Sequence, residues 1–517
     1  MTDRATYPRQ HAKSDPDRAA CLMAASGEIV TYRQLEERAN QGAHLLRACG
    51  LQRGDVVAIV MDNNARYFEL VWAAQRAGLY FTCIPSKSTA SEIEYILRDC
   101  EAKLLVVSSA VERVAGELAQ RLPALRIYMA GAAHPSIASF ESARDAQPTT
   151  PIADESAGTD MLYSSGTTGK PKGVKLPLSG GPIETPVPMD GYAVDTFGFR
   201  AGCIYLSTAP LYHATPLRFG MTVHRLGGTV VIMEQFEPQQ ALALIERHRI
   251  DSATFVPTHF VRLLKLPEDI RSKYDLSSMR SAVHGAAPCP VPVKKAMIDW
   301  WGPVLYEYYS GTEGLGMCCI DSQDWLRHPG SVGKAVFGQL HVCDENGNEL
   351  APRTEGLVYF SGGWQFQYNK DPEKTAQGYN RHGWSTIGDI GWADEEGYLY
   401  LTDRKSFMII SGGVNIYPQE IENLIVTHPK VADVAVIGVP DEDMGEKVVA
   451  IVQPANWSDA GEQLATELEQ FARASLSPYK VPRVFDFVRE LPRTQTGKLV
   501  KGQLRKVYVE RLQGVST

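Results

Sequence analysis

An alternation of strand-like and helix-like segments over the first 130 residues constrains the fold most strongly. Residues 55–61 (DVVAIVM) are almost continuously apolar, as expected of a buried strand. Residues 66–78 (RYFELVWAAQRAG) carry apolar side chains at helical spacing and end on glycine. A second strand is predicted at 103–108 and a second helix at 110–122. This alternation predicts α/β layers built on a largely parallel sheet.

The domain organisation follows from changes in this pattern along the 517 residues, which are too many for one ordinary core. Strand–helix alternation resumes after residue 200. Short strands and turns from residue 330, with a hairpin signal at 345–348 (ENGN), predict a β-rich subdomain. We therefore expect a large N-terminal domain at 1–403 and a small α+β domain at 404–517. Residues 176–191, rich in proline and glycine, are predicted to be an irregular loop.

Composition excludes several classes of protein. Apolar content of 44% and charged content of 22% are ordinary for a globular chain, and the net charge of −8 argues against nucleic acid as a main partner. The first 20 residues lack the apolar core of a signal peptide, and no apolar run is long enough to span a membrane. Nine cysteines without a CxxC pair suit reduced thiols, so we expect a cytoplasmic protein.

The loop at 163–174 (YSSGTTGKPKGV) combines glycines, hydroxyl residues and two lysines. Glycine lets backbone N–H groups approach an anion closely, and Lys170 and Lys172 add positive charge. A triphosphate fits this loop, although a flexible surface turn remains the alternative interpretation. The Walker motif does not fit, because Ser164 stands where that motif needs glycine and proline follows Lys170.

Five further segments accompany this loop: HGAAP (284–288), YYSGTEG (308–314), STIGDIG (385–391), LTDRKSFMIISGGVNIYP (401–418) and PRTQTGKLVK (492–501). Together, and in this order, the six segments resemble the motifs of the adenylate-forming superfamily. That superfamily contains acyl-CoA synthetases, adenylation domains of peptide synthetases and beetle luciferases. The chain is most similar to a bacterial acyl-CoA synthetase. The resemblance implies a large layered α/β domain with a β-rich subdomain and a small, mobile C-terminal domain.

The implied reaction joins a carboxylate to the α-phosphorus of ATP and releases pyrophosphate, after which CoA takes the acyl group and AMP leaves. ATP, Mg²⁺ and CoA are the implied co-reactants. A same-chemistry alternative passes the acyl group to a carrier protein or an amine. A third hypothesis, a catalytically silent nucleotide-binding protein, is disfavoured because the matched motifs retain Thr312, Glu313, Asp389 and Lys498.

The resemblance assigns roles residue by residue. Thr312 is expected to contact phosphate, Glu313 and Thr168 to hold Mg²⁺, and Asp389 to accept hydrogen bonds from the ribose hydroxyls. A core aromatic at Tyr309 and a turn-capping role for Asp389 are the structural alternatives. The residues expected to contact ATP or AMP are Ser164, Ser165, Gly166, Thr167, Thr168, Gly169, Lys170, Lys172, Gly285, Ala286, Ala287, Tyr309, Ser310, Asp389 and Arg404.

The second half of the resemblance concerns catalysis and CoA. Lys498 is the predicted catalytic cation, because a long ammonium side chain can reach both carboxylate and α-phosphate. Ser406 occupies the hinge position, where the family usually carries Asp or Lys. The segment expected to line the pantetheine path is Ser411, Gly412 and Gly413.

The acid itself is defined by a pocket of mostly apolar or aromatic candidates. His213 is expected near the reacting carboxylate, although a lone histidine is more often structural. Only Arg218 and Arg262 offer a second charge, which favours a large hydrophobic monocarboxylate: fatty, aryl or polycyclic. A general resemblance to bacterial synthetases acting on bulky lipid or terpenoid acids slightly favours a polycyclic acid. A homodimer is left open. The predicted acyl-pocket residues are His213, Phe219, His259, His284, Leu315 and Gly316.

Overall fold

The computed structural model describes residues 6–164, 171–404, 407–411, 414–441, 444–492, 499 and 501–512. Its N-terminal sheet has the strand order β7-β6-β5-β3-β4-β8, in which β7 spans Ala138–Ser139, β6 spans Arg126–Ala130, β4 spans Tyr80–Cys83 and β8 spans Thr159–Asp160. The sequence prediction is confirmed here: β3 (Val56–Val60) and β5 (Ala102–Ser108) pair in parallel, and α3 (Arg66–Arg76) and α5 (Glu112–Arg121) follow them. Strand β3 is buried on both faces, which explains its continuous apolar sequence.

A second sheet carries the site. Its order is β17-β16-β15-β14-β13-β11-β12-β1-β2, and neighbouring strands from β12 to β15 run parallel. The flanking members are β17 (Lys334–Phe337), β16 (Met317–Asp321), β11 (Ile204–Ser207), β12 (Thr229–Ile232), β1 (Ala19–Met23) and β2 (Ile29–Thr31). The central members are β13 (Ser252–Phe255), β14 (Ser281–His284) and β15 (Leu305–Ser310). Because parallel strands end at the same edge, the loops after β14 and β15 lie side by side. Two of the predicted nucleotide motifs are therefore brought together.

The predicted β-rich subdomain is an antiparallel sheet with the order β18-β19-β21-β22. Its strands are β18 (Gln339–Cys343), β19 (Gly356–Ser361), β21 (Asp389–Ala393) and β22 (Leu399–Arg404). The prediction for residues 176–191 was wrong at its end. Residues 188–191 begin α7 (Pro188–Asp195), with proline in the first helical turn, where its missing N–H costs nothing.

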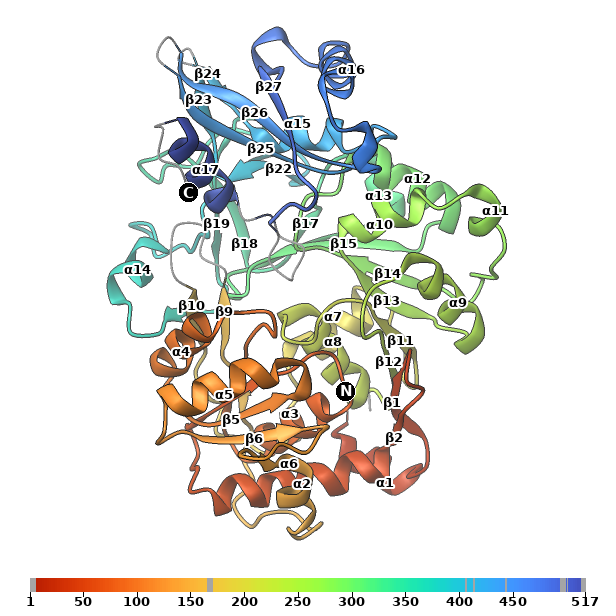
Figure 1. Cartoon of the computed structure of the whole chain (residues 1–517), viewed down its shortest axis with the longest axis vertical. Helices are drawn as coiled ribbons and strands as arrows, with labels where there is room; N and C mark the ends of the chain where they lie inside the picture. The colour runs from red at the N-terminus through yellow and green to blue at the C-terminus, as the bar shows by residue number, and fades with distance from the viewer. Residues whose placement is uncertain are drawn as a thin grey trace.

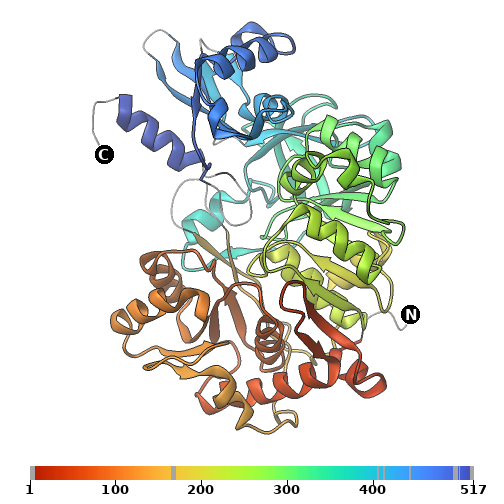
Figure 2. The same cartoon turned by 45° about the vertical axis from the view of Figure 1, so that its right-hand side comes forward.

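The C-terminal residues build a separate sheet with the order β24-β23-β26-β25, and β27 pairs with β26. These strands are β24 (Val414–Ile416), β23 (Ile409–Ser411), β26 (Gly445–Pro454), β25 (Val431–Asp441) and β27 (Val484–Phe487). Helices α15 (Pro418–Ile425), α16 (Glu462–Arg473) and α17 (Lys501–Leu512) accompany this sheet. Figures 1 and 2 both place this part over the second sheet and the β-rich subdomain, away from the N-terminal sheet. The predicted α+β architecture is confirmed, while the boundary at 403/404 stays a prediction.

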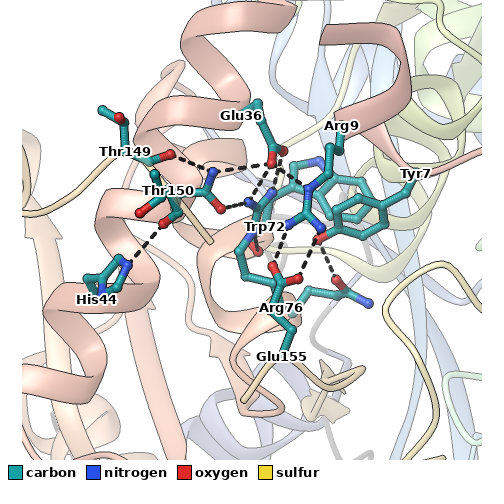
Figure 3. A network of polar contacts seen from close by, with 11 residues as sticks. Tyr7, Arg9, Glu36, His44, Trp72, Arg76, Thr149, Thr150 and Glu155 are labelled. Carbon is teal, nitrogen blue, oxygen red and sulfur yellow. Dashed lines mark hydrogen bonds and ion pairs between the residues drawn. The ribbon is translucent and has the colours of Figure 1, made fainter. Parts of the chain in front are cut away.

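A buried polar network fixes the start of the chain (Figure 3). Arg9 on α1 (Pro8–Ser14) donates to Glu36 on α2 (Tyr32–Ala48) at 2.9 Å and to Glu155 at 3.0 Å. Arg76, which is fully buried, donates to both oxygens of Glu36 at 3.0 and 2.8 Å. Each buried charge in the network thus has a partner of opposite sign.

Within the described part of the chain, no helix is long and apolar enough to cross a membrane.

Candidate active site

A cleft lies where the second sheet, the β-rich subdomain and the C-terminal part meet. Five of the residues predicted to bind nucleotide line it: Ala286, Ala287, Tyr309, Ser310 and Asp389. The loop after β14 supplies the first two, β15 the next two and β21 the last. The C-terminal part contributes the opposite wall, including Glu422, Leu499 and Lys501.

Tyr309 and Asp389 form a fixed pair in this cleft. The Tyr309 hydroxyl donates to the Asp389 carboxylate at 2.7 Å, although the residues are 80 positions apart. Asp389 is buried and opens β21, where the ladder sets it opposite Arg404 of β22. A carboxylate held in this way presents acceptor oxygens in a defined direction.

The loop after β14 approaches β15 closely. A Cβ at Gly285 would lie 2.8 Å from Cε1 of Tyr308, so a side chain does not fit there. Ala286 follows with φ +70°, a left-handed conformation that costs energy for a residue with a side chain. This backbone turns sharply at the carboxyl edge of a parallel sheet, the usual position of a ligand site in such folds.

Glu313 lies in the turn after β15 and is buried. The Tyr368 hydroxyl donates to its carboxylate at 2.9 Å, and Lys172 Nζ lies 5.2 Å from the centre of the Tyr368 ring. Burial, followed by the nearby Lys374 cation, lowers the pKa of Lys172. A carboxylate and an ammonium group thus flank one tyrosine ring. Ser310 lies nearby in sequence and donates to the Gly316 carbonyl at 2.7 Å.

Glu313 fits the role of a Mg²⁺ ligand. In proteins, Mg²⁺ usually takes one or two carboxylates and completes its shell with substrate phosphates and water. Among the residues that the structure describes, no group of three or more His, Cys, Asp or Glu side chains could hold a metal alone. A single carboxylate that shares the ion with a phosphate is consistent with both facts.

His213 precedes α8 (Ala214–Arg225) as its N-cap residue. Its ring centre lies 4.1 Å from that of Tyr212, and the ring is half-buried. Two residues further along, the Thr215 hydroxyl is hydrogen-bonded to Tyr308, which lines the cleft. The first turn of α8 therefore faces β15.

On the C-terminal side, Glu422 and Lys501 form a buried ion pair at 2.9 Å. The same Glu422 oxygen accepts the Val436 backbone N–H at 2.6 Å, and Lys501 Nζ lies 5.2 Å from the Phe407 ring centre. Burial raises the pKa of Glu422, and Lys501 partly offsets this rise. These contacts join α15, α17 and β25 at the wall of the cleft.

Several predicted residues fall outside the described part of the chain: Ser165, Gly166, Thr167, Thr168, Gly169, Lys170, Ser406, Gly412, Gly413 and Lys498. Ser164 ends β9 (Leu162–Ser164) and pairs with Lys172, the first residue of β10 (Lys172–Lys175). Thr312 lies in the turn beside Glu313, and Ser411 is buried at the end of β23 (Ile409–Ser411). The roles assigned to all these residues stay predictions.

The structure does not gather the predicted acyl-pocket residues at the lining of the cleft. Phe219 packs among core aromatic rings, with the Phe199 ring centre at 5.4 Å. His259 stacks on Phe236 at 3.8 Å, and burial lowers its pKa to about 3. His284 is fully buried at the end of β14 and Leu315 lies in the core, while Gly316 packs against Phe360. Their contribution to acid binding stays a prediction.

Sequence reasoning missed Glu307, Tyr308, Tyr368 and Glu422. Glu307 lines the cleft and forms an ion pair with Lys294 at 2.6 Å, and both side chains are buried. Burial raises the pKa of Glu307, and Lys294 opposes that rise. The alternation of side chains along β15 could have indicated Glu307, which lies two residues before Tyr309 and therefore on the same side of the strand. No local signal marks Tyr368, whose partner is 55 positions away.

Comparisons with known proteins find two matching parts of the chain. A family model described as AMP-binding enzyme matches residues 8–367, and one described as AMP-binding enzyme C-terminal domain matches residues 420–498. The chain is 33% identical to a feruloyl-CoA synthase from Amycolatopsis, over 97% of this chain and 98% of that protein. It is 31% identical to the fatty acid–acyl-carrier-protein ligase ScoC of Streptomyces coeruleorubidus, over 96% and 94%.

Among solved structures, the chain is similar to ATP-bound MatB from Rhodopseudomonas palustris. The TM-score is 0.81, with 28% sequence identity over 98% of this chain and 99% of that one. The likeness therefore extends over both the large part and the C-terminal part.

Proposed function

The chain belongs to the AMP-binding enzyme family, and from that premise we propose that it is an ATP-dependent acyl-CoA ligase. In the first step a carboxylate oxygen attacks the α-phosphorus of ATP, an acyl-adenylate forms and pyrophosphate leaves. In the second step the CoA sulfur attacks the acyl carbon, a thioester forms and AMP leaves. The acid–thiol ligase class is supported by the CoA ligases among the relatives.

The observation that carries this proposal is the Tyr309–Asp389 pair beside Ala286 and Ala287 in one cleft. The Asp389 carboxylate suits the paired donors of a ribose. The Tyr309 ring and the two alanines offer apolar surface to a base. These groups come from three motifs far apart in sequence, so their convergence supports a nucleotide site.

The phosphate end of the site has to overcome repulsion between two anions. Unit charges about 4 Å apart repel by roughly 4 kcal/mol at an effective dielectric constant near 20. Lys172 is one described cation there. Glu313, with Thr168 outside the described residues, would hold Mg²⁺, which would neutralise phosphate charge when bound. The site needs positive charge more than it needs a protein nucleophile.

Lys498 supplies the remaining charge in this proposal. It lies outside the described residues, but its neighbours Leu499 and Lys501 line the cleft opposite Tyr309 and Asp389. This position of the C-terminal part supports a role for Lys498 in adenylation. Rotation of that part about Ser406 would then admit CoA past Ser411, Gly412 and Gly413.

The proposed substrate is a hydrophobic monocarboxylate, because neither candidate cation offers a free, buried partner for a second carboxylate. Arg218 donates to both oxygens of Asp160, at 3.3 and 2.7 Å. Arg262 is exposed and lies over the Phe236 ring at 5.0 Å. A dicarboxylate would therefore bury its second charge without a free partner, which is costly.

The test is a panel of acids scored by pyrophosphate release, with and without CoA. Aryl and aliphatic monocarboxylates should release pyrophosphate and form a thioester with CoA, whereas acetate, amino acids and dicarboxylates should be poor. Each buried CH₂ contributes about 0.8 kcal/mol to binding. Several buried CH₂ groups should therefore separate the activity with larger hydrophobic acids from that with acetate by orders of magnitude. Preferential turnover of an α-amino acid would contradict the proposal.

A second candidate function differs only in the acceptor. The similarity to ScoC, a fatty acid–acyl-carrier-protein ligase, favours a carrier protein as the alternative acyl acceptor. An amine is the other acceptor that the same chemistry serves. The two are separated by offering the preformed acyl-adenylate to CoA, a phosphopantetheinylated carrier and an amine. Faster transfer to the carrier or the amine than to CoA would replace the first proposal with this one.

A further inference from the structure

Tyr368 connects the strand that follows the predicted phosphate loop to the buried carboxylate of Glu313. It lies on β20 (Gln367–Tyr368), an outer strand of the small sheet β20-β10-β9. Strands β9 and β10 flank the predicted phosphate loop in sequence, and Tyr368 is paired with Val174 of β10. The backbone of Tyr368 is therefore part of the sheet that supports this loop.

The side chain of Tyr368 reaches from that sheet to Glu313. Its hydroxyl donates to Oε1 of Glu313 at 2.9 Å, across 55 positions of sequence. The other oxygen, Oε2, lies beside Gly311, where an added Cβ would come within 2.9 Å of it. Glu313 is buried, whereas Tyr368 is half-buried. Both carboxylate oxygens thus have a defined neighbour, and the carboxylate is held in one direction.

The ring of Tyr368 binds a cation with its face while its hydroxyl binds the carboxylate. Lys172 Nζ lies over the ring, 5.2 Å from its centre. An aromatic face attracts an ammonium group, so the ring gives Lys172 a partner other than Glu313. A direct pair between Lys172 and Glu313 would neutralise both charges. The ring therefore leaves the carboxylate its negative charge.

The position of Tyr368 is fixed from the opposite side by the segment around it. Its backbone N–H donates to the hydroxyl of Thr375 on α14 (Pro372–Gln377) at 3.0 Å. The Phe366 ring packs edge-on against the Tyr368 ring, with centres 5.2 Å apart. The hydroxyl is thus directed at Glu313 by packing and by the β-ladder, as a group that orients a metal ligand has to be.

Resting on the proposed function, in which Glu313 holds Mg²⁺, we propose that Tyr368 is a positioning residue for the metal that accompanies ATP. Its hydroxyl orients the Glu313 carboxylate towards that metal. Its ring engages Lys172, so that the carboxylate keeps its charge for the metal. Tyr368 acts through Glu313, and groups that orient metal ligands in this way are typically worth about ten- to hundredfold in metal affinity.

The experiment measures how strongly Mg²⁺ enhances nucleotide binding. Calorimetry gives the Kd of α,β-methylene ATP, which cannot release pyrophosphate, in saturating Mg²⁺ and in EDTA. The ratio of the two constants is the metal-dependent gain in affinity. Tyr368→Phe should reduce this gain by about tenfold or more and leave the Kd in EDTA unchanged. A merely structural role would weaken nucleotide binding in EDTA as well.

The hydroxyl and the ring are separated by a second substitution. Tyr368→Phe keeps the ring over which Lys172 lies, whereas Tyr368→Leu removes both ring and hydroxyl. The leucine variant should therefore lose more of the metal-dependent gain than the phenylalanine variant. An equal loss in the two variants would overturn the part assigned to the ring. In steady state, Tyr368→Phe should need about tenfold more Mg²⁺ for half-maximal pyrophosphate release.

Tyr379→Phe is the matched control. The Tyr379 hydroxyl donates to the Phe366 carbonyl at 2.8 Å, and its ring stacks on Phe366 with centres 5.2 Å apart. The control removes a tyrosine hydroxyl from the same segment, but that hydroxyl is bonded to a backbone carbonyl. The metal-dependent gain should therefore stay at the wild-type level, and an equal loss in Tyr379→Phe would overturn the proposal.

A double variant tests whether Tyr368 acts through Glu313. Glu313→Gln alone should reduce the metal-dependent gain, and adding Tyr368→Phe should cause no further loss, because the oriented charge is already absent. Additive losses, or a wild-type gain in Tyr368→Phe, would overturn the positioning role. Melting temperatures confirm that each variant is folded.

These outcomes are distinct from failure of the proposed function itself. If wild type binds the ATP analogue in neither condition and activates no acid of the panel, the ligase assignment fails. If wild type binds the analogue more tightly in Mg²⁺ and Tyr368→Phe keeps that gain, only the positioning role of Tyr368 fails.

Discussion

Two sets of carboxylates in this molecule are held by different partners. In the network beneath α1, Arg9 and Arg76 both donate to Glu36, so cations and carboxylates are matched to one another (Figure 3). At the candidate site, Asp389 in the cleft and Glu313 in the turn after β15 accept hydrogen bonds from tyrosine hydroxyls, whereas Glu307 and Glu422 in the cleft lining pair with lysines. A hydroxyl orients a carboxylate without cancelling its charge.

The contrast separates a structural use of charge from a functional one. The network joins segments far apart in sequence and stabilises the N-terminal sheet and its helices. The cleft holds charge in position for a ligand that brings its own charges. Substitutions in the network should therefore change stability, and substitutions in the cleft should change activity.

The largest expected effect on stability is that of Arg76→Met. Arg76 is fully buried, and its loss leaves the Glu36 carboxylate without its bidentate partner. Removing one member of a buried pair typically costs about 3–5 kcal/mol. Urea unfolding should show this loss, while activity per folded molecule stays at the wild-type level. The double variant Arg76→Met/Glu36→Leu should recover part of the stability, because the Glu36 carboxylate is removed together with its partner Arg76. Further loss of stability in the double variant would contradict the pairing.

On the activity side, the strongest expected effect is that of Lys498→Ala. Its ammonium should matter while carboxylate and phosphate are forced together, and little once the acyl-adenylate exists. We expect at least about a hundredfold loss of pyrophosphate release, corresponding to a charge-assisted contact of about 3 kcal/mol. Thioester formation from preformed acyl-adenylate and CoA should survive. Adenylation near the wild-type rate would disprove the role of Lys498 and direct attention to Lys501.

The pH dependence of the free energy of unfolding gives a smaller difference between the two regions. Burial alone would raise the pKa of Glu36, but Arg76 and Arg9 outweigh burial and lower it below its ordinary 4.5. The contribution of Glu36 to stability is therefore complete above pH 4.5 and is lost as pH falls through the lowered pKa, by at most about 1.4 kcal/mol per pH unit. The difference in unfolding free energy between wild type and Glu36→Gln should shrink below pH 4.5.

Glu422 in the cleft wall should behave with the opposite sign. Burial raises its pKa above 4.5, so its contribution is present below pH 4.5 and is lost as pH rises through the raised pKa. Relative to wild type, Glu422→Gln should gain stability as pH rises from 4 to 8. Parallel pH profiles for Glu36→Gln and Glu422→Gln would contradict the distinction.

Local patterns predicted much of this molecule, and long-range contacts account for what was missed. The run at 55–61 identified β3 because a strand buried on both faces has to be apolar throughout. The start of α7 was missed because proline marks both a loop and a first helical turn. Motifs identified Tyr309 and Asp389, but not Tyr368 or the Arg76–Glu36 pair, whose partners are brought together only by the fold.

The most direct test of this contrast makes one chemical change in both regions. Glu313→Gln removes the charge of a buried carboxylate and Glu36→Gln that of a partly buried one, and each variant is measured for pyrophosphate release and for its free energy of unfolding. We predict that Glu313→Gln loses at least about a hundredfold in activity per folded molecule, with stability within about 1 kcal/mol of wild type. Glu36→Gln should lose about 3–5 kcal/mol of stability and keep its activity per folded molecule. If Glu313→Gln instead loses stability while retaining adenylation, or Glu36→Gln loses adenylation while remaining as stable as wild type, the division between the two regions is wrong.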